Sequence, residues 1–240
     1  MQIYSKTDIG LKRSSNQDSV FTGSLDNETL FAIVCDGMGG AKAGNVASKI
    51  ACDVISEYVS RSFRKKMDSY DIEKMLGNAI LSANMEIFDA SSAEELRGMG
   101  TTVVAAIITK DRINIAHVGD SRAYIAGDTL TQITRDHSVV QTLVESGEIT
   151  PIEARQHPRK NVITRALGVE ENVLPDFNEL PFSEGETLLL CTDGLTGYAE
   201  AESIFNILKI TTDTAPEKLI ELANAGGGGD NITVVTVNNI

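Results

Sequence analysis

The chain has 240 residues, of which 42% are hydrophobic, and this is enough apolar material for one globular core. Its 34 acidic residues outnumber the 21 basic ones and give a net charge of −13, which disfavours nucleic acid and anionic membrane surfaces as partners. No apolar run approaches the roughly 20 residues of a membrane span, and the N-terminus has no signal-peptide core. We therefore expect a cytoplasmic location.

Short runs rich in β-branched residues predict strands over 29–35, 101–109, 112–118, 122–125, 186–191 and 231–237. Apolar residues at helical spacing predict two long amphipathic helices over 45–63 and 72–87, and later helices over 200–209 and 215–225. The connections between 101 and 130 are too short for crossover helices, so we expect an antiparallel sheet there and not a doubly wound domain. The chain has no Pro/Ser-rich linker and no repeat, which favours a single domain over residues 1–240.

The segment 136–168 differs from its surroundings because it combines prolines, short helical pieces and several basic residues. We interpret it as an inserted flap. His137 and His157 lie in it, and exposed structural residues are the default interpretation there. His117 lies in an alternating strand and is expected to be half-buried and structural. None of these histidines is predicted to be catalytic.

The three cysteines, Cys35, Cys52 and Cys191, are odd in number, far apart and embedded in apolar runs. They are interpreted as small buried hydrophobes in a reducing compartment. The pattern predicts neither a disulfide framework nor a zinc site.

Four aspartates stand at the ends of apolar strands, each beside a glycine: Asp36, Asp120, Asp193 and Asp230. An ionised carboxylate at the margin of a core loses hydration, and divalent cations compensate for this through hard oxygen ligands. A neighbouring glycine lets the backbone itself approach the ion. A single Asp-Gly pair is most simply a turn, but four recurrences favour a shared metal site.

The ordered motifs of the chain resemble those of the PP2C-type, or PPM, protein phosphatase family in its bacterial form, over nearly the whole length. In chain order they are RSSNQD (13–18), DGMGG (36–40), GMGTT (98–102), VGDSR (118–122), DHS (136–138), NVITRALG (161–168), TDGL (192–195) and GDNIT (229–233). The resemblance implies an α+β fold, a four-layer α/β/β/α sandwich. Two antiparallel sheets would pack face to face, with helices outside, the metals at one edge and a flap insertion.

The resemblance also implies two Mn²⁺ or Mg²⁺ ions. Asp36 would bridge both, Asp193 and Asp230 would complete the first, and the backbone carbonyl of Gly37 would touch the second. Asp18 would act through metal-bound waters.

Two further residues are assigned from the resemblance. Asp120 occupies the position that in bacterial members helps to hold a third, weaker cation; the alternative is that it caps the turn before Arg122. Arg13 matches the arginine that grips the substrate phosphate, and its planar fork suits paired hydrogen bonds to phosphate oxygens.

The implied reaction is hydrolysis of phosphoserine and phosphothreonine in proteins by a water or hydroxide that bridges the two cations, without a phosphoenzyme. None of the cysteines lies in the loop expected of a cysteine-dependent phosphatase. Animal members commonly have His after the metal-binding Asp-Gly, where this chain has Met38, which cannot donate a proton. We therefore predict a metal-bound water as general acid, positioned with the help of Asp120.

We expect phosphorylated proteins as substrates, a bacterial Ser/Thr kinase as the opposing enzyme, and a monomer. One alternative is a catalytically inactive relative that serves as a binding or regulatory module, but retention of Asp36, Asp193 and Asp230 argues against it. Another is a regulatory phosphatase of sporulation or stress signalling. Such proteins usually carry an added sensor or membrane domain, which this sequence lacks.

Overall fold

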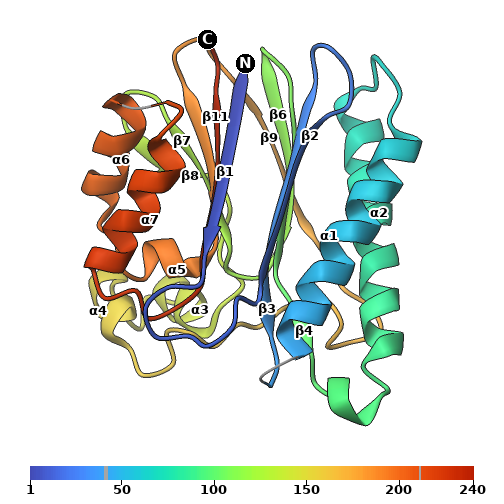
Figure 1. Cartoon of the computed structure of the whole chain (residues 1–240), viewed down its shortest axis with the longest axis vertical. Helices are drawn as coiled ribbons and strands as arrows, with labels where there is room; N and C mark the ends of the chain where they lie inside the picture. The colour runs from blue at the N-terminus through green and yellow to red at the C-terminus, as the bar shows by residue number, and fades with distance from the viewer. Residues whose placement is uncertain (41–42, 211) are drawn as a thin grey trace.

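The structure is a computed structural model that describes residues 1–40, 43–210 and 212–240. Two antiparallel sheets stand face to face at its centre, and helices cover both outer faces (Figure 1). This is the α/β/β/α sandwich that the family resemblance implied. In the described part of the chain, no helix is both long enough and apolar enough to cross a membrane.

The first sheet has the order β1 (Gln2–Asp8), β11 (Ile232–Asn238), β10 (Thr187–Cys191), β7 (Arg122–Ala126) and β8 (Leu130–Gln132). The second has the order β2 (Asp18–Ser24), β3 (Leu30–Met38), β5 (Val103–Ile108), β6 (Arg112–Val118) and β9 (Asp176–Pro181), with the short β4 (Gly100–Thr101) paired to the end of β3. All pairings are antiparallel, as expected for 101–130.

Helices α1 (Ala43–Ser62) and α2 (Ser69–Ala90) cover the second sheet, and α6 (Ala201–Ile210) and α7 (Ala215–Ala225) cover the first (Figure 1). The remaining helices are short: η1 (Glu94–Leu96), α3 (Val139–Glu145), α4 (Pro151–Gln156) and α5 (Asp193–Thr196). The four long helices lie where apolar spacing predicted them.

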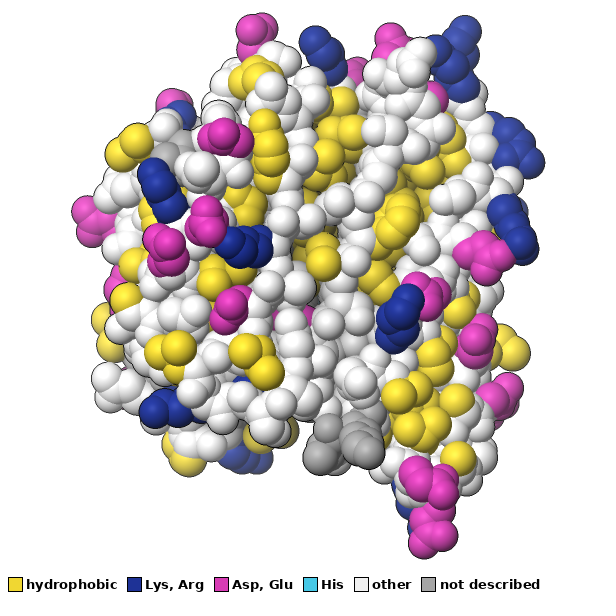
Figure 2. All heavy atoms as spheres, in the orientation of Figure 1, with side chains coloured by type: hydrophobic (Ala, Val, Ile, Leu, Met, Phe, Trp, Pro, Cys, Tyr) yellow, Lys and Arg dark blue, Asp and Glu magenta, His cyan; other side chains and the backbone are white. Residues whose placement is uncertain are grey.

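The core has three apolar layers because successive strand residues face opposite sides of a sheet. In β3, Ala32 and Val34 face the other sheet, where they meet the layer that contains Leu190 and Val235. Ile33 and Cys35 face α1 and α2. Figure 2 shows hydrophobic side chains in the seam between β1 and β2, with acidic and basic side chains interspersed on the surrounding surface.

Strands buried on both faces were predicted, whereas β1, β2, β8 and β9 were not. The sequence of β1, QIYSKTD, is mostly polar, and the strand lies at the edge of its sheet with several exposed residues. An edge strand of this kind carries little hydrophobic periodicity. The predicted strand over 101–109 is divided into β4 and β5 at Thr102.

The segment 136–168 contains α3 and α4, and its two ends lie side by side. Ser138 forms a β-bridge with Ile163, and the Thr164 amide donates to the His137 carbonyl at 2.7 Å. The interpretation of His137 as exposed was wrong, because its side chain is buried. It points inward against His117, which is also buried. All three cysteines are free and buried, as predicted.

Candidate metal centre

Five aspartates reach one edge of the sandwich, at the end opposite the two chain termini (Figure 1). Asp18 opens β2 and is paired with Asp36, near the end of β3. Asp193 follows β10 after one residue, as the first residue of α5. Asp230 precedes β11, and Asp120 lies in the turn between β6 and β7. Residues from both ends of the chain therefore meet.

Mutual repulsion shows how closely these carboxylates lie. Burial, followed by the Asp18, Asp193, Asp120 and Asp230 charges, raises the pKa of Asp36 well above its ordinary value. Burial and then Asp230 raise the pKa of Asp193. Burial also raises the pKa of Asp18 to about 7, and burial with the Asp193 charge raises that of Asp120 to about 8. Such crowding of acids in a buried place needs compensation by positive charge.

Hydrogen bonds satisfy the cluster only in part. Asp18 Oδ2 accepts from Thr192 Oγ1 at 3.0 Å and from Thr233 Oγ1 at 2.7 Å. Asp18 Oδ1 and Asp193 Oδ1 are buried, and no described residue donates a hydrogen bond to either. The Asp36 and Asp193 side chains interact, and two ionised carboxylates held close together need a proton or a cation to offset their repulsion.

Arg13 is the guanidinium that contacts this cluster. Its Nη2 lies 2.7 Å from Asp230 Oδ2, and about half of its side chain is exposed. It also interacts electrostatically with Asp36 and Asp193. Arg122 also acts electrostatically on Asp120 and Asp193, but its guanidinium is paired with Asp136. Two cations therefore face six carboxylates, and the site keeps an excess of negative charge.

Gly37 is placed where only glycine fits. A Cβ there would lie 2.0 Å from the Gly44 carbonyl oxygen and 2.5 Å from that of Gln17. The backbone after Asp36 can therefore pack directly against the first turn of α1. The amide of Gly37 donates to the Gln17 carbonyl at 3.1 Å, which ties this strand end to the loop before β2.

Two threonines hold the backbone of Asp36 through hydrogen bonds. The Asp36 amide donates to Thr102 Oγ1 at 3.0 Å, and Thr101 Oγ1 donates to the Asp36 carbonyl at 2.9 Å. Thr102 Oγ1 also pairs with Ser121 Oγ at 2.7 Å, next to Asp120. These supporting residues were not predicted, although the GMGTT and VGDSR motifs that contain them were noticed.

Asn231 holds the loop that carries Arg13. Its Nδ2 donates to the carbonyls of Ile9 and Ser15 at 2.9 and 3.0 Å, and its Oδ1 accepts from the Gln17 amide at 2.8 Å. The sequence analysis predicted no role for Asn231, although its position directly after Asp230 in the GDNIT motif could have indicated that it lies at the site.

The structure brings Arg13, Asp18, Asp36, Asp120, Asp193 and Asp230 into one electrostatic group. The donor set is made of hard oxygens, carries excess negative charge and includes buried carboxylate oxygens without a donor. Mn²⁺ and Mg²⁺ prefer such oxygens, so the residues fit the divalent cations that the sequence led us to expect.

Comparisons with known proteins identify the family of the chain. The profile of the family Protein phosphatase 2C matches residues 12–221. The serine/threonine phosphatase stp of Listeria monocytogenes is 43% identical over 238 residues, which cover 97% of this chain and 93% of that protein.

Solved structures of similar proteins share the fold. The serine/threonine phosphatase of S. agalactiae has a TM-score of 0.92 at 36% identity, over 99% of this chain and 98% of that one. The catalytic domain of the phosphatase PstP, in complex with two manganese ions, has a TM-score of 0.83 at 35% identity, over 98% and 96% of the two chains. On the strength of the family match and these relatives, the chain belongs to the protein phosphatase 2C family.

Proposed function

We propose that this chain is a metal-dependent protein serine/threonine phosphatase whose two Mn²⁺ or Mg²⁺ ions are held by Asp36, Asp193, Asp230 and the Gly37 carbonyl. Asp18 would contribute through water, and Asp120 would hold a third, weaker cation. The manganese-bound PstP relative supports two cations. The observation that carries the assignment is the meeting of aspartates of which two, Asp18 and Asp193, have a buried carboxylate oxygen without a donor.

When bound, the cations would supply positive charge for a phosphate dianion and lower the pKa of the attacking water. The protein's own residues then account for binding and orientation. Arg13 is half exposed, so its guanidinium can turn from Asp230 to paired oxygens of a substrate phosphate. Thr192 and Thr233 fix one oxygen of Asp18, which leaves the other to orient water.

Protonation of the leaving serine or threonine oxygen needs a proton donor. Met38, which stands where animal members commonly have His, cannot donate a proton. We propose that water held with the help of Asp120 gives this proton. If Asp120→Ala cleaved substrate at an unchanged single-turnover rate at saturating metal, this assignment would be wrong.

The proposed activity is tested by hydrolysis of p-nitrophenyl phosphate and of a phosphothreonine peptide with added Mn²⁺. We expect activity that EDTA abolishes and that Asp36→Asn loses. Asp53→Asn is a suitable control, because Asp53 is an exposed residue of α1 that pairs with Lys49 outside the centre. Absence of activity with several metals would favour the alternative of an inactive binding module.

We further propose phosphoproteins as substrates, a cognate bacterial Ser/Thr kinase as the opposing enzyme, a monomeric state and a cytoplasmic location. We also propose that residues 1–240 form one domain with a flap over 136–168. Comparison of phosphoproteomes between a deletion strain and its parent would identify the substrates, and light scattering would measure the oligomeric state.

A further inference from the structure

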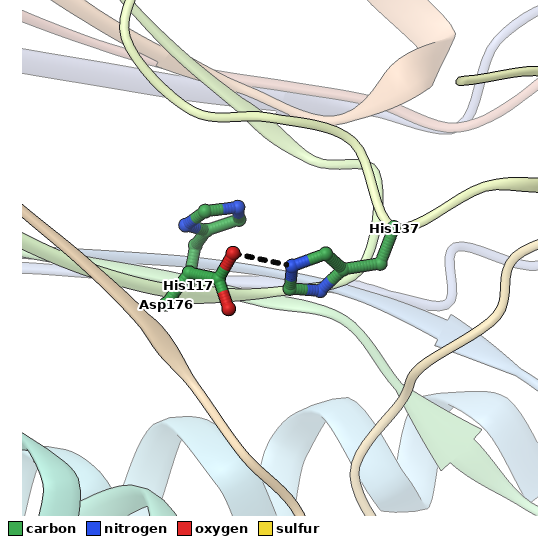
Figure 3. Close-up of side chains that lie close together, drawn as sticks. All are labelled: His117, His137 and Asp176. Carbon is green, nitrogen blue, oxygen red and sulfur yellow. Dashed lines mark ion pairs between the residues drawn. The ribbon is translucent and has the colours of Figure 1, made fainter. Parts of the chain in front are cut away.

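Two histidines and an aspartate form a second polar cluster, close to the base of the flap (Figure 3). His117 lies on β6 directly opposite Asp176, the first residue of β9, and His137 lies at the start of the flap segment. The two imidazole rings are stacked, with centroids 4.8 Å apart and planes at 18°. Both rings are buried, and the mechanism proposed above uses none of the three residues.

The hydrogen bonds of His137 locate its proton. Its Nδ1 accepts from the Gly119 amide at 3.1 Å, so a neutral ring carries its proton on Nε2. That Nε2 faces Asp176 Oδ2 at 3.2 Å (Figure 3). A protonated nitrogen offers no lone pair to a cation, so although these groups lie close enough together for a metal, the contact between His137 and Asp176 is better described as electrostatic. At 3.2 Å its geometry falls short of a hydrogen bond.

Asp176 also holds the other end of the flap. Arg165 Nη1 donates to Asp176 Oδ1 at 2.6 Å and to the Leu174 carbonyl at 3.2 Å. Arg165 belongs to the last residues of the segment 136–168, and His137 to its first. One carboxylate therefore contacts both ends of the flap, each through a different oxygen.

Gly119 connects this cluster to the metal centre. The His137 amide donates back to the Gly119 carbonyl at 2.9 Å, so the two residues are joined by a pair of hydrogen bonds. Gly119 has φ +106°, and a Cβ on it would lie 2.6 Å from Thr102 Cγ2. Thr102 Oγ1 in turn accepts from the Asp36 amide. The turn that carries Asp120 is thus held between His137 on one side and Thr102 on the other.

We propose that His137, fixed by Asp176, is a positioning residue that sets the Gly119–Asp120 turn for the weaker, third cation of the metal centre. The inference rests on the proposed function. It connects the flap to the metal centre, because His137, near the start of the flap, also determines the position of the Asp120 carboxylate. Residues that orient a metal ligand commonly change metal affinity about 10–100-fold when they are replaced.

Two isosteric replacements separate the two contacts of His137. In His137→Gln the carboxamide reaches the place of Nε2, so it can contact Asp176 but leaves the Gly119 amide without its acceptor. In His137→Asn the side-chain oxygen takes the place of Nδ1, so it keeps Gly119 and loses Asp176. Both variants remove the ring that stacks on His117, so a difference between them reports which of the two contacts, with Gly119 or with Asp176, matters more.

The readout is Mn²⁺ binding to the whole protein, with free Mn²⁺ counted by electron paramagnetic resonance during titration. We expect His137→Gln to weaken the third Mn²⁺ by at least about 10-fold while the first two are unchanged. His137→Asn and Asp176→Asn should each weaken it by about threefold, and the double variant by no more than either, because both remove the same contact. Exchange of the Gly119 amide, followed by NMR, should accelerate in His137→Gln alone.

His157→Gln is the matched control, because this flap histidine is half-buried and, among the described residues, its side chain accepts a hydrogen bond from the nearby Arg159 amide through Nδ1 and from no other donor. Three wild-type Mn²⁺ affinities in His137→Gln would overturn the inference, and so would an equal loss of all three ions, which would indicate general structural damage. A wild type that binds only two Mn²⁺ and is active would overturn this inference and the third-cation role of Asp120, but would leave the proposed phosphatase activity and its two-cation centre intact. A wild type that binds no Mn²⁺ would overturn both.

Discussion

The two carboxylate clusters differ in how far the protein itself satisfies them. Asp176 has a partner for each oxygen, Arg165 at 2.6 Å and His137 at 3.2 Å. Although burial raises its pKa, interactions with these two partners lower it overall. In the aspartate cluster, burial and like charges raise the pKa of Asp36. An acid that the chain neutralises has a structural role, whereas acids left without cations and donors indicate a site for an ion.

The largest effect is expected when a carboxylate is removed from the aspartate cluster. Asp36→Asn should lower Mn²⁺-dependent phosphatase activity by at least about 100-fold, since a residue proposed to bridge two cations should matter more than residues behind the ligands. The measurement is kcat/KM for a phosphothreonine peptide over a range of Mn²⁺ concentrations. Full activity restored by high Mn²⁺ would show that Asp36 is not a bridging ligand.

The same variant should become more stable when metal is absent. Removing one of several buried carboxylates relieves repulsion, so in EDTA the Tm of Asp36→Asn should exceed that of the wild type. Asp176→Asn should do the opposite, because it removes a partner from Arg165 and His137. Equal Tm changes in both variants would mean that the two clusters do not differ as described.

Addition of metal should make the wild type more stable than Asp36→Asn, the reverse of the order of their Tm values in EDTA. A cation that binds only the folded protein stabilises it by about 2.7 kcal/mol at a concentration 100 times its Kd, which corresponds to a Tm increase of about 5–10 °C for a chain of this size. Mn²⁺ should therefore raise the Tm of the wild type but hardly that of Asp36→Asn. Differential scanning calorimetry with Mn²⁺ and with EDTA measures both.

Removing the partner of a satisfied carboxylate is expected to have a smaller effect. Arg165→Met leaves Asp176 with His137 only, and because the pair is partly exposed we expect a loss of about 0.5–1 kcal/mol in the free energy of unfolding. Arg155→Met is the control, since Arg155 pairs with Glu200 in a more exposed position and should change stability less. Urea unfolding curves with unchanged slopes would give both values, and a greater loss in Arg155→Met would contradict the comparison.

The sequence predicted the aspartate cluster better than the histidine cluster for a physical reason. Asp36 lies near the end of β3, and Asp193 follows β10 after one residue. The apolar runs of these buried strands make an acid at their end conspicuous. Asp18 was found only through the family resemblance, because β2 is half-buried along its length. Asp176 opens β9, whose residues DFNELP have no clear alternation, so nothing near it marked a partner for His137.

The contribution of His117 and His137 to the stability of the folded protein should depend on pH. Burial lowers the pKa of His117 and of His137, so each binds a proton less readily in the folded than in the unfolded protein. Their contribution to stability is then present above about pH 6.5 and is lost as the pH falls through the folded-state values. The nearby charges of Asp176 and Arg165 do not reverse these directions.

The crowded aspartates change stability with pH in the opposite direction. Their raised pKa values favour proton uptake by the folded protein, so they make it more stable as the pH falls. The quantity to measure is therefore the Tm difference between wild type and His137→Asn in EDTA from pH 8 to pH 5. Because the variant lacks one buried histidine, the wild type should lose stability relative to it below about pH 6.5. A difference that stays constant over this range would mean that His137 takes up its proton equally well in both states, and would contradict the description of its ring as buried and neutral.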